Sequence, residues 1–247
     1  VDTDISPYDS GSYASATTYI TGKAVAKAAE NLKEKVIKMG ASMLEVEPDE
    51  VTFNGKCVEK KDQSAKVTLP EIGVRGTFGN NDALQVTENC GAEISPPPYM
   101  VGIAEVEIDK ETGSVELIDY VAVVDCGTPI NPNLARVQTE GGIAQGIGMA
   151  LFEDIQYTEK GAMANNSLMQ YKIPSRLDVG KIRVEFKPSY EKSHPFGAKS
   201  IGEIVIDTPC PAIANAVYNA VGLRVEEMPI KPEKIAMALS DDCKMYE

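Results

Sequence analysis

The sequence predicts an α+β fold, and three observations support this fold class. Helical patterns occupy residues 23–39 and 134–152, the β-prone runs come in adjacent pairs, and helices and hairpins follow one another without a regular strand-helix alternation. A doubly wound α/β fold would require that alternation. The 247 residues are 43% apolar and 25% charged, which is ordinary for a globular chain. One domain, divisible into subdomains of about 1–98 and 99–247, is expected.

The first predicted element is an amphipathic helix. Residues 1–22 are rich in Ser, Thr, Tyr, Asp and Gly and lack a sustained period, which indicates a loop. From Lys23 to Met39, apolar residues recur three and four positions apart, and this spacing predicts one buried helix face. Gly40 follows as the expected stop signal.

Two antiparallel strand pairs are predicted next. Asn54-Gly55 separates two short β-prone runs, 51–53 and 56–59, and this dipeptide is typical of a tight hairpin turn. A longer pair covers 99–109 and 114–125, which are rich in Val, Ile, Leu and Tyr and are joined by a turn that contains glycine.

The remaining chain mixes helices, one strand and loops. The sequence 131–133 (Asn-Pro-Asn) supplies a helix start, and 134–152 continues with small and apolar residues that predict a buried, closely packed helix. A strand is expected at 182–186, an alanine-rich helix at 211–221 and a last helix that begins near Pro232.

Charge and hydropathy exclude several classes of function. Thirty-seven acidic and 24 basic residues give a net charge of -13, which disfavours binding to nucleic acid or to anionic membrane. The chain has no run of 18 apolar residues and no secretory signal pattern, so we expect a soluble, cytoplasmic protein. Because the sequence opens on Val1 rather than methionine, we interpret it as a piece of a longer protein or a processed chain.

Cysteine and histidine are too sparse for a protein-built metal centre of the common kind. The five cysteines are far apart and their odd number suits reduced, structural thiols. His194 is the one histidine, so a tetrahedral zinc site would lack ligands, and we expect no metal ligation by side chains. The chain also lacks the G-x-S-x-G elbow of a hydrolase, which would be needed to give His194 a role as base.

The glycine-rich helix allows two interpretations. Residues 141–148 do not directly follow a strand and lack the third glycine of a dinucleotide-binding fingerprint, so we favour close helix packing instead. Packing accounts for the glycines but leaves Gln138 and Gln145 unexplained. These lie seven positions apart on nearly the same face, and once buried their amides would need polar partners such as a bound ligand.

Two polar segments are candidate binding or catalytic sites. Glu203 ends a glycine-punctuated run, 197–203, and precedes an apolar stretch, where a carboxylate could act as a general base; a solvated loop glutamate is the alternative. Hydroxyls gather before the first helix and could either hold phosphate oxygens or cap the helix. This hydroxyl cluster consists of Ser12, Ser15, Thr17 and Thr18.

Together these motifs resemble the molybdopterin-binding region of the xanthine dehydrogenase and aldehyde oxidase family of molybdenum hydroxylases, over nearly the whole chain. The segments that carry the resemblance, in family order, are 13–18, 125–132, 138–146, 171–174 and 197–203. The resemblance implies an α+β domain with antiparallel or mixed sheets and packed helices. It also implies that residues 1–247 form the C-terminal half of a molybdopterin-binding domain, similar to a medium subunit.

The resemblance assigns roles to individual residues. Glu203 takes the place of the family's catalytic base, and Gln138 that of the glutamine that contacts the pterin-bound metal centre. Lys199 and Ser200 are expected to border the pterin. The loop expected to bind the dinucleotide end of the cofactor, in its cytosine dinucleotide form, contains Ser15, Ala16, Thr17 and Thr18. Many relatives carry arginine where this chain has Ala16, and loss of that charge weakens phosphate binding.

The resemblance also implies partners. The family's other cofactor-binding half has no match here, so we expect a second molybdopterin-binding chain or an N-terminal half to complete the site. The 2Fe-2S and FAD groups are expected on partner chains only. The substrate class is an N-heterocycle, purine-like or nicotinate-like, or an aldehyde.

Two hypotheses of different class remain. In the first, the chain is part of a molybdenum hydroxylase and is inactive alone, and the presence of Glu203 and Gln138 favours it. In the second, the chain is a cofactor-free module with an assembly or scaffold role. Ala16 and the missing half favour this second hypothesis.

Overall fold

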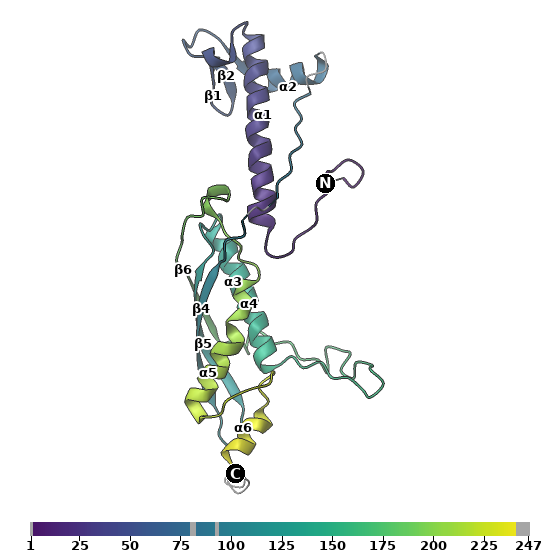
Figure 1. The fold of residues 1–247 in the computed structure, drawn as a ribbon, viewed down its shortest axis with the longest axis vertical. Coiled ribbons are helices and arrows are strands. Elements are labelled where there is room, and N and C mark those ends of the chain that lie inside the picture. Colours follow the sequence, from purple (N-terminus) through teal and green to yellow (C-terminus); the bar gives the residue numbers. More distant parts are fainter. Residues whose placement is uncertain (1, 80–82, 92–93, 241–247) are drawn as a thin grey trace. The chain divides into compact units, whose positions relative to one another are not determined.

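The computed structural model describes residues 2–79, 83–91 and 94–240, and the chain divides into two compact units (Figure 1). The first unit takes its described residues from 1–11 and 17–93, and the second from 12–16 and 94–240. The short segment 12–16 is therefore separated in sequence from the rest of its unit.

The first unit contains two helices and a small antiparallel sheet with the strand order β1-β2-β3. Its elements are a π-helix at Thr17–Thr21, α1 at Gly22–Met43, a 3-10 turn at Pro48–Glu50, β1 at Val51–Phe53, β2 at Cys57–Lys60, β3 at Lys66–Thr68 and α2 at Leu69–Phe78. The predicted hairpin is confirmed, because β1 and β2 pair antiparallel on either side of Asn54-Gly55. Gly55 adopts φ +88°, a left-handed conformation that glycine takes without strain.

The prediction that Gly40 ends the first helix is wrong, because α1 continues to Met43. A Cβ on Gly40 would lie 2.6 Å from Cβ of the fully buried Val58. This glycine is therefore needed for the close approach of α1 to β2 rather than for a stop. Other buried apolar residues complete this core: Val36, Ala41, Val51, Val67 and Ile72.

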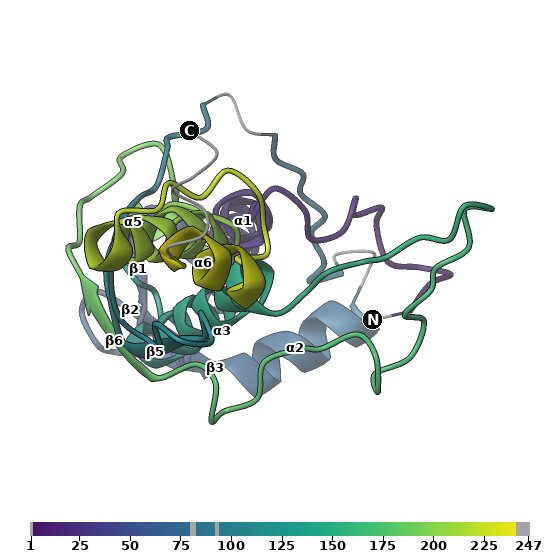
Figure 2. The same cartoon turned by 90° about the horizontal axis from the view of Figure 1, so that it is seen from below.

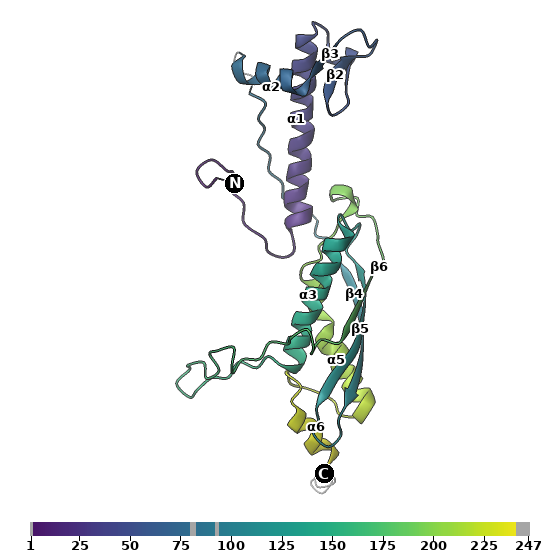
Figure 3. The same ribbon diagram turned by 180° about the vertical axis from the view of Figure 1, so that it is seen from behind.

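The second unit is a three-stranded mixed sheet with helices on one face (Figures 2 and 3). Its elements are β4 at Tyr99–Ile108, β5 at Val115–Asp125, α3 at Pro132–Leu151, β6 at Lys181–Phe186, a 3-10 turn at Pro195–Gly197, α4 at Ile204–Asp207, α5 at Pro209–Val221 and α6 at Pro232–Leu239. The β4-β5 pair is antiparallel, as predicted, and β6 runs parallel to β5. The expected mixed α+β architecture is thus confirmed.

The core of the second unit lies between the sheet and the helices α3 and α5. The parallel β5-β6 pair needs a crossover connection, and α3 supplies its helical part. Asn131 caps α3 by accepting a hydrogen bond from the Leu134 backbone amide at 3.1 Å. Large, fully buried side chains come from all of these elements: Tyr120, Val124, Ile143, Ile147, Val184, Ile213 and Val217.

The glycines of α3 let the chain at 205–209 approach this helix closely. A Cβ on Gly142 would lie 2.2 Å from Cγ2 of Val205, and a Cβ on Gly146 would lie 2.6 Å from the Pro209 ring. A Cβ on Gly141, by contrast, would meet nothing within 4 Å. The predicted close helix packing is therefore confirmed for Gly142 and Gly146.

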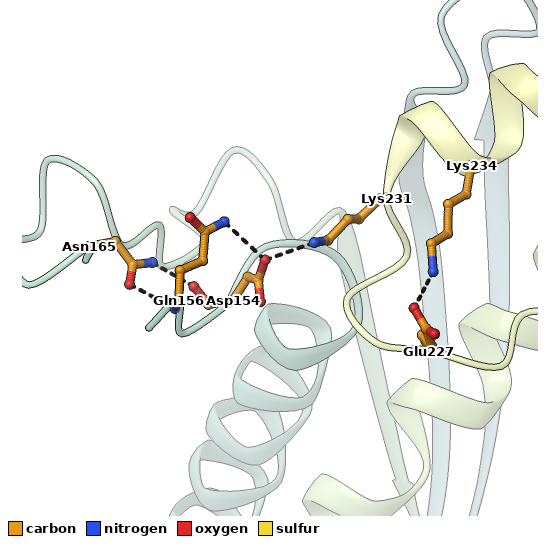
Figure 4. A network of polar contacts seen from close by, with 6 residues as sticks. All are labelled: Asp154, Gln156, Asn165, Glu227, Lys231 and Lys234. Atoms are coloured by element: carbon orange, nitrogen blue, oxygen red, sulfur yellow. Dashed lines mark hydrogen bonds and ion pairs between the residues drawn. The ribbon is translucent and has the colours of Figure 1, made fainter. Parts of the chain in front are cut away.

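A polar network joins the segment after α3 to the segment before α6 (Figure 4). The Asp154 carboxylate pairs with the Lys231 ammonium at 3.0 Å and accepts a hydrogen bond from the Gln156 side chain. The Asn165 side chain donates a hydrogen bond to the Asp154 backbone carbonyl and accepts one from the Gln156 backbone amide. These contacts fix the base of the long loop that connects α3 to β6.

The described residues contain no helix that is long and apolar enough to cross a membrane. Four cysteines lie in the described ranges as free thiols, and Cys126 is the one of these that is buried. Cys243 lies outside the described residues.

The α3 packing generates a paired prediction. Gly141→Ala should raise the free energy of unfolding by up to about 1 kcal/mol, because alanine favours helix and meets open space. Gly142→Ala should lower it by about 1–3 kcal/mol, because the new methyl group overlaps Val205. Urea denaturation of both variants measures this, and equal effects at the two positions would contradict the packing.

Candidate functional site

The loop that ends in Glu203 is attached to the end of β5. The Lys199 amide donates to the Cys126 carbonyl at 2.8 Å, and the Thr128 amide donates to the Gly197 carbonyl at 2.8 Å. Gly127 and Ala198 form an antiparallel bridge between these hydrogen bonds. Residues 197–199 thus extend the sheet locally.

Gly127 makes this attachment possible. Its φ of +68° lies in the left-handed region, and a Cβ there would lie 2.3 Å from the Gly197 carbonyl oxygen. A side chain at this position would therefore carry both backbone strain and a clash with the loop. The glycine in the Asp125-Cys126-Gly127-Thr128 segment is needed for contact between two backbones.

An ion pair reinforces the same attachment. The Lys199 ammonium lies 2.9 Å from Asp125 Oδ2, and the two side chains are 10% and 20% exposed. The Asp125 Oδ1 atom accepts hydrogen bonds from the Gly127 amide at 2.9 Å and from the Ser189 hydroxyl at 2.8 Å. The Lys199 ammonium also lies 5.5 Å from the centre of the Tyr99 ring.

The environment of Asp125 favours its charged form. Burial raises the pKa of the Asp125 carboxyl, but the hydrogen bonds from Lys199, Gly127 and Ser189 outweigh burial and hold the pKa below its ordinary value. Lys199 therefore faces a carboxylate at neutral pH, and its charge is used inside the protein.

Glu203 stands at the start of α4, where the chain turns toward α3. The fully buried Val205 packs on Gly142 two residues later. The Glu203 side chain itself is exposed, and its Oε2 atom accepts a hydrogen bond from the Ser15 hydroxyl at 3.0 Å. The carboxylate is therefore held by a polar contact and is not enclosed by the apolar residues that follow it.

Ser15 reaches this position from a strained loop. Ala14 and Ser15 have φ values of +48° and +53°, a left-handed conformation that costs about 1–2 kcal/mol for each residue other than glycine. Strain of this kind persists where the surroundings hold it in place, and it is often found at functional sites. Here it accompanies the placement of the Ser15 hydroxyl against Glu203.

Gly202 is the point around which the site residues meet. A Cβ on Gly202 would lie 3.0 Å from Ser15 Oγ and 3.8 Å from Gln138 Nε2. Residues from positions 15, 138 and 203, far apart in the sequence, therefore converge at one place in the second unit.

The expectation of buried amides on α3 is wrong, because Gln138 and Gln145 are both exposed. Both lie one turn from Gly142, on nearly the same face of α3, and their side chains remain accessible to solvent. The amides therefore need no protein partner, and Gln138 is accessible beside Gly202.

The other predicted site residues are placed differently. Ala16 is buried, with 8% of its surface exposed, and Ser200 is half-buried on the loop before Glu203. Thr17 and Thr18 are exposed residues of the π-helix in the first unit. Of the predicted set, the structure brings together Ser15, Gln138 and Glu203.

Sequence reasoning gave no role to the residues that hold the loop. Asp125 and Tyr99 contact Lys199, and Ser189 holds Asp125, yet these three residues come from separate segments. A lysine among glycines and an aspartate that ends an apolar strand are opposite charges in low-polarity surroundings, and this is the signal that could have suggested their pairing.

A separate cavity of about 200 Å³ lies beside α6. Its lining mixes charges with apolar residues: Leu223, Arg224, Val225, Glu226, Glu227, Ile230, Lys231, Lys234 and Ile235. Two of its cations are already paired, Lys231 with Asp154 and Lys234 with Glu227 (Figure 4). None of the predicted site residues lines it. In the described part of the chain, no group of three or more His, Cys, Asp or Glu residues could hold a metal ion.

Comparison with known proteins identifies the family. Residues 1–180 match the model of the molybdopterin cofactor-binding domain. The chain is 37% identical over 242 residues to a probable hypoxanthine oxidase, XdhD, of Escherichia coli K12. This match covers 96% of this chain and 25% of that protein. The chain is 32% identical over 244 residues to the 6-hydroxypseudooxynicotine dehydrogenase complex subunit gamma of Paenarthrobacter nicotinovorans, covering 95% of this chain and 31% of that protein.

Solved structures agree with the sequence matches. A Cu,Mo-CO dehydrogenase superposes with a TM-score of 0.79 at 25% identity, over 99% of this chain and 32% of that chain. Quinoline 2-oxidoreductase from Pseudomonas putida 86 gives 0.78 at 28% identity, over 96% and 32%. The chain thus spans about a quarter to a third of the length of these relatives. It belongs to the xanthine dehydrogenase family of molybdenum oxidoreductases, as a molybdopterin cofactor-binding domain.

Proposed function

We propose that this chain forms one side of the cofactor site of a molybdenum hydroxylase, with Glu203 as its general base. The observation that carries the proposal is the convergence of Ser15, Gln138 and Glu203 around Gly202. The family resemblance nominates each of these residues separately, and nothing in the sequence requires them to meet.

The groups around Gly202 suit a molybdenum-pterin cofactor. They offer a hydroxyl, an exposed amide and a carboxylate, which can form hydrogen bonds and accept a proton. Gln138 would hold the cofactor at its metal end, and Lys199 and Ser200 would border the pterin through their loop. When bound, the cofactor supplies the oxidation-reduction chemistry of molybdenum.

Glu203 would accept the proton released during hydroxylation. The Ser15 hydroxyl fixes Oε2, and we assign Oε1 as the atom that takes the proton. A positioned carboxylate base contributes about 10²–10⁴-fold to rate. The exposure of Glu203 in this chain suits a base that a cofactor and substrate cover on binding.

The substrate class follows from the chemistry named for the relatives. One relative is a probable hypoxanthine oxidase and another is a quinoline 2-oxidoreductase, and both hypoxanthine and quinoline are electron-poor N-heterocycles. We infer that the enzyme to which this chain belongs oxidises an N-heterocycle, purine-like or nicotinate-like, or an aldehyde at carbon.

The remaining parts of the enzyme lie on other polypeptide segments. We infer a second molybdopterin-binding chain or N-terminal half, together with subunits that carry 2Fe-2S and FAD. Relatives named as the gamma subunit of a complex and as the large chain of CO dehydrogenase support partner chains. We further propose the cytosine dinucleotide form of the cofactor, whose dinucleotide end would approach Ser15, Ala16, Thr17 and Thr18.

The placement of Ala16 favours a second candidate function, a cofactor-free assembly module. Ala16 is buried and carries no charge for a phosphate, whereas the family resemblance led us to expect arginine there. In this alternative, the chain folds and binds its partner but holds no cofactor.

Substitution of the proposed base tests the first function. In the assembled enzyme, Glu203→Gln should lower kcat by about 10²–10⁴-fold and leave the molybdenum content unchanged, because glutamine keeps the volume but accepts no proton. Glu185→Gln on β6, an exposed strand residue, is the matched control and should keep full turnover. Full activity of Glu203→Gln would exclude Glu203 as the base.

Cofactor content separates the two candidate functions. Molybdenum analysis and oxidised-pterin fluorescence should give near-stoichiometric cofactor for the chain purified with its native partners. The chain alone should contain little, because one side of the site is missing. A metal-free complex with its partners would favour the assembly module.

A further inference from the structure

We propose that the Asp125-Lys199 ion pair is a positioning device that sets the place of Glu203. This inference rests on the proposed function of Glu203 as base. It gives Lys199 a role directed into the protein, and it gives Asp125 and Ser189 roles that the family resemblance did not suggest.

The segment before Glu203 is attached to the end of β5 and the residues that follow it at several points. The backbone of 197–199 is bound to 126–128 by two hydrogen bonds of 2.8 Å. The Lys199 side chain adds the ion pair with Asp125, the last residue of β5. One residue, Lys199, is therefore tied to the sheet through both its main chain and its side chain.

The Asp125-Lys199 ion pair is largely shielded from solvent. The Lys199 side chain is 10% exposed, so solvent screens its charge much less than that of a surface lysine. Asp125 is itself held by the Gly127 amide and the Ser189 hydroxyl, so it cannot follow Lys199 if the loop moves. Because the Asp125 carboxylate is fixed, its ion pair with Lys199 forms at one position of the loop.

Another attachment lies just after Glu203 in the chain. Val205 is fully buried and packs on Gly142 of α3. Glu203 thus sits between two fixed points, Lys199 and Val205, within reach of the Ser15 hydroxyl. Loss of the Lys199 attachment would let the segment pivot about Val205, and a displacement of about 1 Å can cost about 10²-fold in rate.

Hydrogen exchange on the 247-residue chain tests the positioning directly, without cofactor. The variants are Lys199→Met, Asp125→Asn, the double variant and Lys199→Arg. Removing one partner leaves a buried charge and lowers global stability, whereas the double variant removes both charges. The matched control is Asp119→Asn. Asp119 lies on β5, the same strand as Asp125, and the substitution breaks its ion pair with Arg183 of β6, away from the loop.

We expect amides 198–203 to exchange at least about 10-fold faster in Lys199→Met and also in the double variant, and we expect little change in the interior of α5 in the double variant, which removes both charges. Lys199→Arg should restore most of the protection, and Asp119→Asn should leave the loop unchanged. In the assembled enzyme, Lys199→Met should lower kcat by about 10²-fold with KM changed less than about 3-fold.

Two results would overturn the proposal. The first is unchanged hydrogen exchange at amides 198–203 in Lys199→Met. The second is a return of these amides to normal protection in the double variant, because an ion pair that acts only through global stability would give that result. Glu203→Gln separates this proposal from the function it rests on. If Glu203→Gln keeps full activity, the base assignment fails while the exchange data still decide the loop anchor. If Glu203→Gln is inactive but Lys199→Met keeps its kcat, the positioning role fails.

Discussion

The close contact between α3 and the segment 205–209 is the constraint on which the candidate site depends. Gly142 and Gly146 present bare backbone to Val205 and Pro209, so α4 and the start of α5 lie directly against the helix. Gln138, one turn before Gly142 on nearly the same face of α3, is exposed beside Gly202. The contact also fixes the chain two residues after Glu203. A single packing choice thereby sets the positions of both an amide donor and the proposed base.

The helices and strands with strong periodicity were predictable from the sequence, whereas their contacts were not. The spacing of apolar residues locates α1 and the β4-β5 pair, and Asn131-Pro132 locates the start of α3. Gly40 shows the limit of such reasoning, because its local signal is a stop and its tertiary role is contact with Val58. The short β3 and α2 were missed. A three-residue strand has too few residues to show a period, and the proline and two glycines of α2 weaken its helical pattern.

The candidate site was predicted residue by residue through resemblance, but its geometry was not. The sequence places Ser15, Gln138 and Glu203 in three distant segments, and they converge beside Gly202 through the tertiary fold. Burial was also misjudged for Gln138, because a helix with small residues on several faces gives no clear amphipathic direction. The Lys199 partner was invisible, since pairing with Asp125 requires that the loop return to the end of β5.

The use of Lys199 inside the protein has a consequence for how a cofactor with phosphate groups would be bound. Attraction to phosphate needs an available positive charge or oriented amides. Here Lys199, the lysine nearest to Glu203 in sequence, neutralises Asp125, and Ala16 brings no charge. The net charge of the whole chain is -13. The side of the site contributed by this chain thus favours hydrogen bonding and proton transfer over charge neutralisation. Under the proposed function, the positive charges that offset the phosphates would come from the segment that completes the site, and neither side would bind the cofactor tightly without the other.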